Sequence, residues 1–127
     1  MDCIYETETI GDQEILYYRV HKNYFRLSKI VPQAFQSKGD GMSTDWAKYS
    51  TEQESYSRCK IPADNAIVSL STADIRSEKL LDAIHKPEDN NQSHSLVVGI
   101  PTNEPFKTEV RLHLMKIHKE VIHLINQ

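Results

Sequence analysis

Two histidines enclose the most polar stretch of the sequence. Residues 85–94 read His-Lys-Pro-Glu-Asp-Asn-Asn-Gln-Ser-His, so His85 and His94 flank a run of carboxylates and amides. If each histidine lies at a strand end, the loop returns the chain and brings the two imidazoles close together. Paired histidines suit general acid–base chemistry, because the imidazole titrates near neutral pH. The structural alternative is that both rings bond loop carbonyls, while Asn91 closes a turn.

A metal site is the other chemistry that this pair allows. A third ligand would come from Asp45, Asp89 or His21. However, the two loop histidines lack the short spacing typical of metal ligands, and the two cysteines, Cys3 and Cys59, form no Cys-x-x-Cys pair. We therefore predict no bound metal, no cofactor and two reduced thiols.

A second polar group lies on the strand expected at 14–21. Arg19 and His21 are two residues apart, so their side chains share one face of a strand. A guanidinium beside an imidazole suits a phosphate or carboxylate ligand. The structural alternative is an ion pair between the arginine and a carboxylate at the rim of the sheet.

A third group, Ser43 and Asp45, supplies a hydroxyl and a carboxylate. The sequence has no Gly-x-Ser-x-Gly elbow, no Gly-x-x-x-x-Gly-Lys-[Ser/Thr] phosphate loop and no Gly-x-Gly-x-x-Gly fingerprint. Serine hydrolases with that elbow, P-loop NTPases and most dinucleotide-binding enzymes are therefore disfavoured.

The hydrophobic pattern predicts the elements that position these groups. The Thr-x-x-Glu sequence at 51–54 has the form of a capping box and starts a helix. At the C-terminus, apolar residues recur at spacings of 4, 3, 4 and 3 from Val110 to Leu124, which indicates one amphipathic helix beginning near Pro105. Along the chain we expect strands at 14–21, 66–71 and 94–100, helices at 52–58 and 73–79, and a loop at 36–45. Residues 80–85 could continue the second helix or form a further strand, and a strand is preferred because Lys86-Pro87 ends it.

This order of elements predicts an α+β domain spanning residues 1–127, with a mixed or antiparallel sheet packed against the C-terminal helix. The 127 residues are 39% hydrophobic and 26% charged, with a formal net charge of −3. An acidic balance does not favour nucleic-acid binding. The sequence has no apolar run long enough to span a membrane and no signal peptide, so a cytoplasmic location is expected.

Three segments together carry a resemblance. They are Pro32-Gln33-Ala34-Phe35, then Gly41-Met42-Ser43-Thr44-Asp45, and last His85-x-Pro87 with Asn91 and His94. The arrangement resembles a widespread group of small uncharacterised prokaryotic proteins with Ala-Phe, Leu-Ser-Val-Asp-like and His-x-Pro…Asn-x-x-His-Ala motifs. Here Met42, Thr44 and Ser95 replace the Leu, Val and Ala. The resemblance implies a shared core and a shared polar loop over about residues 15–100, and it supplies no reaction.

Two functions remain open from the sequence. One is a small binding or interaction domain, as an accessory of a prokaryotic defence or toxin-type system, acting through a protein partner or a second copy. The other is a small enzyme acting on a phosphate- or ribose-containing substrate, so whether the chain is an enzyme stays undecided. In the second case the proton-transfer candidates are His85, His94 and His21, and the ligand-binding candidates are Arg19, Ser43, Asp45 and Asn91.

Overall fold

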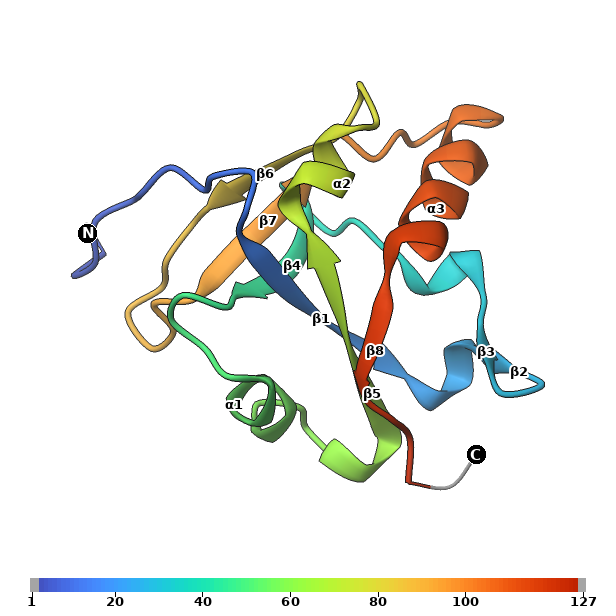
Figure 1. Ribbon diagram of the computed structural model, residues 1–127, viewed down its shortest axis with the longest axis horizontal. Helices are drawn as coiled ribbons and strands as arrows, with labels where there is room; N and C mark the ends of the chain where they lie inside the picture. The colour runs from blue at the N-terminus through green and yellow to red at the C-terminus, as the bar shows by residue number, and fades with distance from the viewer. Residues whose placement is uncertain (1–2, 126–127) are drawn as a thin grey trace.

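The centre of the protein is one six-stranded sheet in which every neighbouring pair of strands is antiparallel. A computed structural model describes residues 3–125 of the chain (Figure 1). The strand order is β6-β7-β4-β1-β5-β8, and a two-stranded hairpin, β2-β3, lies beside it. The strands are β1 (Ile15–His21), β2 (Phe25–Arg26), β3 (Lys29–Ile30), β4 (Met42–Trp46), β5 (Asn65–Ser71), β6 (Asp82–His85), β7 (His94–Val98) and β8 (Lys119–Ile122). The predicted α+β class is confirmed.

Short helices connect the strands. The capping box predicted at the start of α1 is present, because Thr51 Oγ1 accepts from the Glu54 amide and Glu54 Oε1 accepts from the Thr51 amide, at 3.0 and 2.9 Å. The helices are α1 (Glu52–Ser57), α2 (Thr72–Arg76) and α3 (Phe106–Ile117), and the 3₁₀ turns are Lys22–Tyr24, Pro32–Ala34 and Pro62–Asp64. No helix within residues 3–125 has the length and apolar character needed to cross a bilayer.

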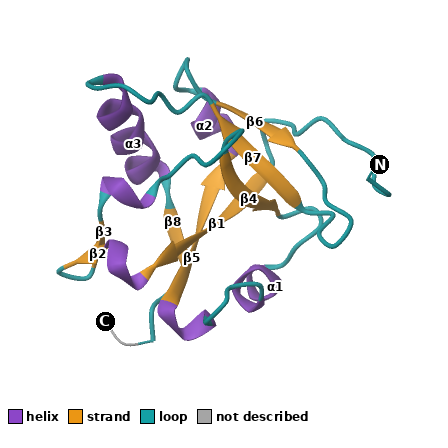
Figure 2. Cartoon of the chain, turned by 180° about the vertical axis from the view of Figure 1, so that it is seen from behind, coloured by secondary structure: helices purple, strands orange, loops and turns teal. Residues whose placement is uncertain are grey.

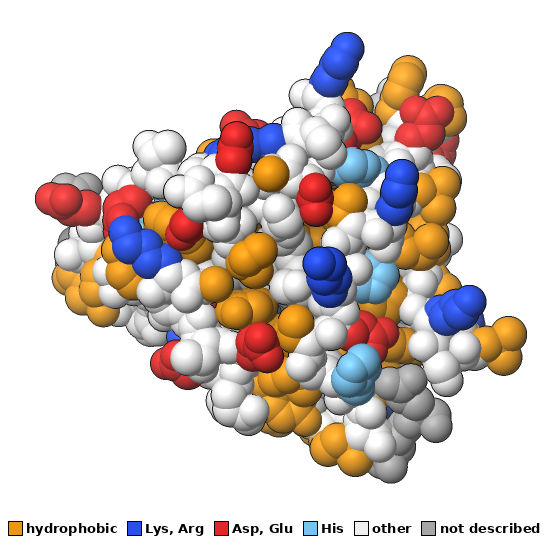
Figure 3. Space-filling view, in the orientation of Figure 1, with side chains coloured by type: hydrophobic (Ala, Val, Ile, Leu, Met, Phe, Trp, Pro, Cys, Tyr) orange, Lys and Arg blue, Asp and Glu red, His pale blue; other side chains and the backbone are white. Residues whose placement is uncertain are grey.

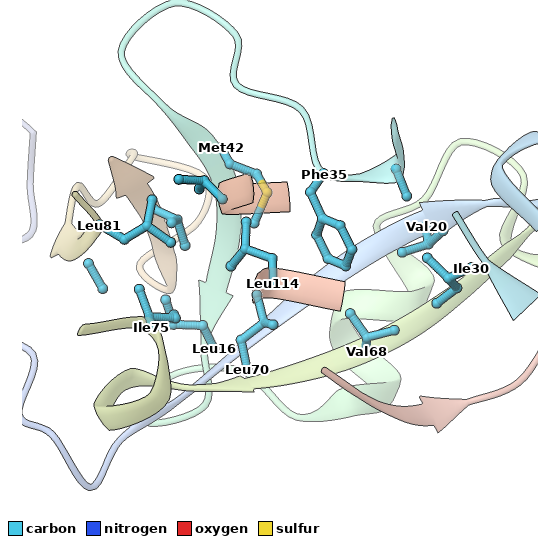
Figure 4. Packing of buried hydrophobic residues seen from close by; sticks show 14 of the residues in the cluster. Leu16, Val20, Ile30, Phe35, Met42, Val68, Leu70, Ile75, Leu81 and Leu114 are labelled. Atoms are coloured by element: carbon cyan, nitrogen blue, oxygen red, sulfur yellow. The ribbon is translucent and has the colours of Figure 1, made fainter. Parts of the chain in front are cut away.

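The two faces of the sheet have different character because side chains alternate along each strand. On β1, Leu16 and Val20 are buried in the hydrophobic core, whereas Arg19, between them, is exposed on the other face. The core face is covered by α2 and α3. Leu114 of α3 packs there with Leu16, Leu70, Met42 and Phe35 (Figure 4). In contrast, α1 lies apart from α2 and α3 (Figure 2) and leaves much of the second face open.

The prediction of a loop over 36–45 is wrong for its second half. Gly39 lies in a turn with a φ of +61°, which favours glycine, but Met42–Trp46 forms the interior strand β4. Its residues alternate, with Met42 and Trp46 buried in the core and Asp45 facing the open side. The hydrophobicity pattern did not reveal this alternation, because three of the five residues are polar, namely Ser43, Thr44 and Asp45. Pairing with β1 and β7 on either side stabilises the strand.

The C-terminal helix is shorter than predicted. Helix α3 ends at Ile117, His118 adopts an extended conformation, and the following residues pair with β5 as the edge strand β8. Val121 and Leu124 therefore do not extend the helical stripe, although Val110 and Leu114 are buried as expected. Because the unpaired edge of β5 offers backbone hydrogen bonds, sheet pairing prevails over local helical periodicity here.

Candidate functional site

A cleft of about 550 Å³ opens beside β1 and β4, lined mainly from the face of the sheet that α2 and α3 do not cover and also by Tyr18 and Thr44 of the core face. Strands β1 and β4 pair only through Leu16 and Tyr17, and the cleft lies where they diverge. Both ends of the cleft and its walls carry residues singled out from the sequence. Six of those seven candidates line it, namely Arg19, His21, Ser43, Asp45, Asn91 and His94.

Asp45 is the centre of the hydrogen-bond network at one end of the cleft. Its Oδ1 accepts from Asn91 Nδ2 at 3.0 Å, and its Oδ2 accepts from an Arg58 nitrogen, also at 3.0 Å. The same Arg58 nitrogen lies 2.9 Å from Ser50 Oγ. Only 17% of the Asp45 side chain is exposed, so this ion pair is stronger than a fully solvated one. Asp45 therefore joins β4 to both the 86–93 loop and the end of α1.

Asn91 uses both ends of its amide within the protein. Its Nδ2 donates to Asp45, while its Oδ1 accepts from the Ser93 amide at 3.1 Å and from the Ser93 hydroxyl. These bonds hold the 86–93 loop against β4. The geometry accordingly gives Asn91 a supporting position at the wall of the cleft, the turn-closing role that an asparagine commonly has.

His94 has a ring orientation fixed by two contacts. Its Nδ1 lies 2.8 Å from the carbonyl oxygen of Lys86, and its Nε2 lies 3.3 Å from Ser43 Oγ. A carbonyl only accepts, so Nδ1 carries the proton and the neutral ring presents the Nε2 lone pair to the Ser43 hydroxyl. The ring is half-buried and faces the cleft.

His85 lies outside the cleft, on the opposite face of the sheet. It is 3% exposed, and its ring centroid lies 5.1 Å from that of Trp46 and 6.0 Å from that of Tyr49. Its Nδ1 accepts from the Glu8 amide at 3.0 Å, and its Nε2 donates to the Gln92 carbonyl at 2.8 Å. The hypothesis that the two loop histidines shape one cleft is therefore wrong. Both rings match the structural alternative in bonding a carbonyl, His85 that of Gln92 and His94 that of Lys86.

Arg19 and His21 follow Tyr17 on β1, and His21 lies at the other end of the cleft. The Nδ1 atom of His21 accepts from the Asn23 amide at 3.1 Å, which leaves Nε2 as the nitrogen directed away from its own turn. Arg19 lies beside the buried Cys59. Burial raises the pKa of that thiol, and the nearby Arg19 guanidinium partly opposes the rise.

The two ends of the cleft are well separated. Tyr17 is the β1 partner of Asp45, and His21 lies four residues further along the same strand, which is about 13 Å at the usual rise of a strand. His21 and His94 therefore serve different parts of an elongated cleft. Arg19 lies between these ends along β1. At the Asp45 end, burial, with a smaller contribution from Glu52, raises the pKa of the Tyr17 hydroxyl.

The charge of the cleft differs from that of the chain. Four cationic side chains line it against two carboxylates, although the whole chain carries a net charge of −3. The carboxylates are already paired, Asp45 with Arg58 and Asp64 with Lys22 at 3.1 Å. Among residues 3–125, no ion pair involves the three other cations of the cleft, which are Arg19, Lys38 and Lys60. On the face that Figure 3 shows, Lys and Arg side chains are interspersed with Asp and Glu side chains.

Three of these cations escaped the sequence analysis. Lys38, Arg58 and Lys60 belong to no motif and come from segments before β4 and after α1. For Arg58 the sequence did offer a signal, because this residue directly follows α1, the helix that the capping box predicts. Within the described part of the chain, no three His, Cys, Asp or Glu side chains gather in a way that could hold a metal ion.

Comparison with known proteins finds no matching family model, no similar curated protein and no similar solved structure.

Proposed function

We propose that this protein binds a small molecule carrying a phosphate group, such as a ribose phosphate, in the cleft between β1 and β4. The observation that carries the proposal is the placement of Arg19, Lys38 and Lys60, which line the cleft without a carboxylate partner among residues 3–125. Guanidinium and ammonium groups are the usual donors to phosphate oxygens in proteins.

The neutral lining of the cleft supports a ribose-containing ligand. Tyr17 presents a hydroxyl group and His21 an imidazole, and both lie on β1 on either side of Arg19. These groups exchange hydrogen bonds with sugar hydroxyls, while the cations bind the phosphate. The part of the lining that strands carry, which includes Arg19 and Ser43, is formed before a ligand arrives, whereas Lys38 and Lys60 lie in segments that connect the elements.

Calorimetric titration with ribose 5-phosphate, inorganic phosphate and uncharged ribose tests the proposal. We expect ribose 5-phosphate to bind and ribose alone not to bind. The double substitution Arg19→Gln/Lys60→Gln should weaken binding at least about tenfold, since a hydrogen bond to a charged group contributes about 1.5–3 kcal/mol. Raising the salt concentration should weaken binding as well.

The matched control is Lys29→Gln/Lys79→Gln, which removes the same charge from two exposed sites outside the cleft. Equal weakening by both double variants would show that only net charge matters and would contradict a specific site. Absence of binding to either phosphate compound would also contradict the proposal, and it would favour the interaction-domain hypothesis.

A further inference from the structure

We infer that Ser43 and His94 form a nucleophile–base pair through which a phosphoryl group passes from the bound ligand to Ser43 Oγ. This inference rests on the proposed phosphate-binding function and adds a reaction to it. The two side chains come from neighbouring strands, β4 and β7, and meet at the cleft with Ser43 Oγ 3.3 Å from His94 Nε2. A hydroxyl within reach of an oriented imidazole is the arrangement that activates a serine.

The orientation of the base is built into the strand register. The Lys86 amide donates to the His94 carbonyl at 3.0 Å, and the His94 Nδ1–H donates back to the Lys86 carbonyl at 2.8 Å. One residue thus binds both the backbone and the ring of His94. The Lys86 carbonyl takes the place that a carboxylate has in a catalytic triad, where it fixes the tautomer with Nε2 unprotonated.

The nucleophile is accessible and has cations nearby. Ser43 is exposed at the cleft, which lets a bound phosphate approach its hydroxyl. Asp45 lies two residues along the same face, about 7 Å away by strand geometry, and holds Arg58. Arg19 extends from the facing strand β1 into the same cleft. Both guanidinium groups line the same cleft as Ser43, and in this reaction they would stabilise the negative charge of the transferred phosphoryl group.

The reaction balances with the groups at hand. Ser43 Oγ attacks phosphorus, the Oγ–P bond forms and the bond from phosphorus to the ligand's ester oxygen breaks. The Ser43 proton passes to His94 Nε2 and from there to the departing oxygen, so the products are phosphoserine and an alcohol. Water then attacks phosphorus while His94 Nε2 accepts a proton from it, and the Oγ–P bond breaks. That proton passes from His94 to Ser43 Oγ, which releases phosphate and restores the hydroxyl.

A fluorophosphonate probe tests the pair without knowledge of the substrate. Attack by Ser43 would form an Oγ–P bond and expel fluoride, and peptide mass spectrometry would locate the adduct. We expect the adduct on Ser43 in the full chain, none in Ser43→Ala, and labelling at least about 100-fold slower in His94→Gln, the usual loss when a general base is removed. Ser69→Ala, on the same face of β5, and His123→Gln are the controls and should label at the normal rate.

The outcomes separate the pair from the proposed binding function. No adduct on Ser43, or an adduct whose rate is unchanged in His94→Gln, would overturn the pair even if ribose 5-phosphate binds. An adduct that depends on His94 in a protein that binds no phosphate would support the pair and contradict the proposed function. Nitrogen NMR of the His94 ring gives a second measurement. The ring should carry its proton on Nδ1 in the wild type and in Ser43→Ala, and a ring protonated on Nε2 alone would overturn the inference.

Discussion

His85 and His94 lie on opposite faces of the sheet and adopt opposite tautomers. On paired strands β6 and β7, His85 is the partner of Ser95, so the neighbouring His94 points the other way. His85 donates from Nε2 and accepts at Nδ1, whereas His94 donates from Nδ1. The first ring belongs to the packing around Trp46, and the second belongs to the cleft.

Replacing the two histidines should therefore have unequal effects on stability. His85→Ala should lower the free energy of unfolding by about 1–3 kcal/mol, because it leaves the Glu8 amide and the Gln92 carbonyl without their partner. His94→Ala removes a half-buried ring at the cleft and should cost less than about 1 kcal/mol. Urea unfolding curves of the two variants check the difference. Equal losses would contradict the assignment of His85 to structure and of His94 to the cleft.

The contact between Asp45 and Asn91 should appear as an energetic coupling. A double-mutant cycle with Asp45→Ala and Asn91→Ala should give a coupling of about 1 kcal/mol, since the 3.0 Å hydrogen bond between them has a charged acceptor. The cycle is measured by chemical unfolding, with Asn90→Ala as a control at an exposed neighbouring position. Additive effects of the two substitutions would show that Asn91 does not hold the loop through Asp45.

The buried side of α3 should be essential to stability. Leu114 is fully buried among core residues, so Leu114→Ala should cost about 2–5 kcal/mol and lower the thermal midpoint. The matched control is Leu112→Ala, because Leu112 lies on the same helix and is 44% exposed. Its substitution should change stability by no more than about 0.5 kcal/mol. Similar midpoints for the two variants would contradict the packing of α3 on the sheet.

Asp82 should make the protein less stable in acid. Its hydrogen bond from Arg76, at 2.8 Å, is the main cause that lowers the pKa of the carboxyl below its ordinary value of 3.8. A carboxyl with a lowered folded pKa stabilises the fold above that ordinary value, and the contribution is lost as the pH falls through the folded pKa. The contribution is no more than about 1 kcal/mol, because 58% of the side chain is exposed.

Urea unfolding of the wild type and of Asp82→Asn, at pH 6 and again near pH 2, measures this contribution. The wild type should be the more stable protein at pH 6, and the gap should shrink in acid. Carbon NMR titration of the Asp82 carboxyl gives the pKa directly. A gap that stays constant with pH would show that the ion pair with Arg76 adds nothing to stability.

The sequence by itself determined the elements whose signals are local. The capping box of α1 depends on Thr51 and Glu54 alone, and both of its hydrogen bonds lie within one helical turn. Strand β1 was predictable with its two faces, because alternation is a property of the strand itself, and it placed Arg19 and His21 together.

Tertiary structure decided the elements and contacts that depend on distant partners. Strand β4 is too polar to be recognised until β1 and β7 pair with it, and β8 forms because β5 has a free edge. The face on which each histidine lies follows from a register between β6 and β7, and a shift of one residue would exchange the two faces. The pairing of β4 with β7 brings Ser43 to His94, and the position of α1 brings Arg58 to Asp45. Neither contact could be predicted, because no local pattern shows which distant elements become neighbours.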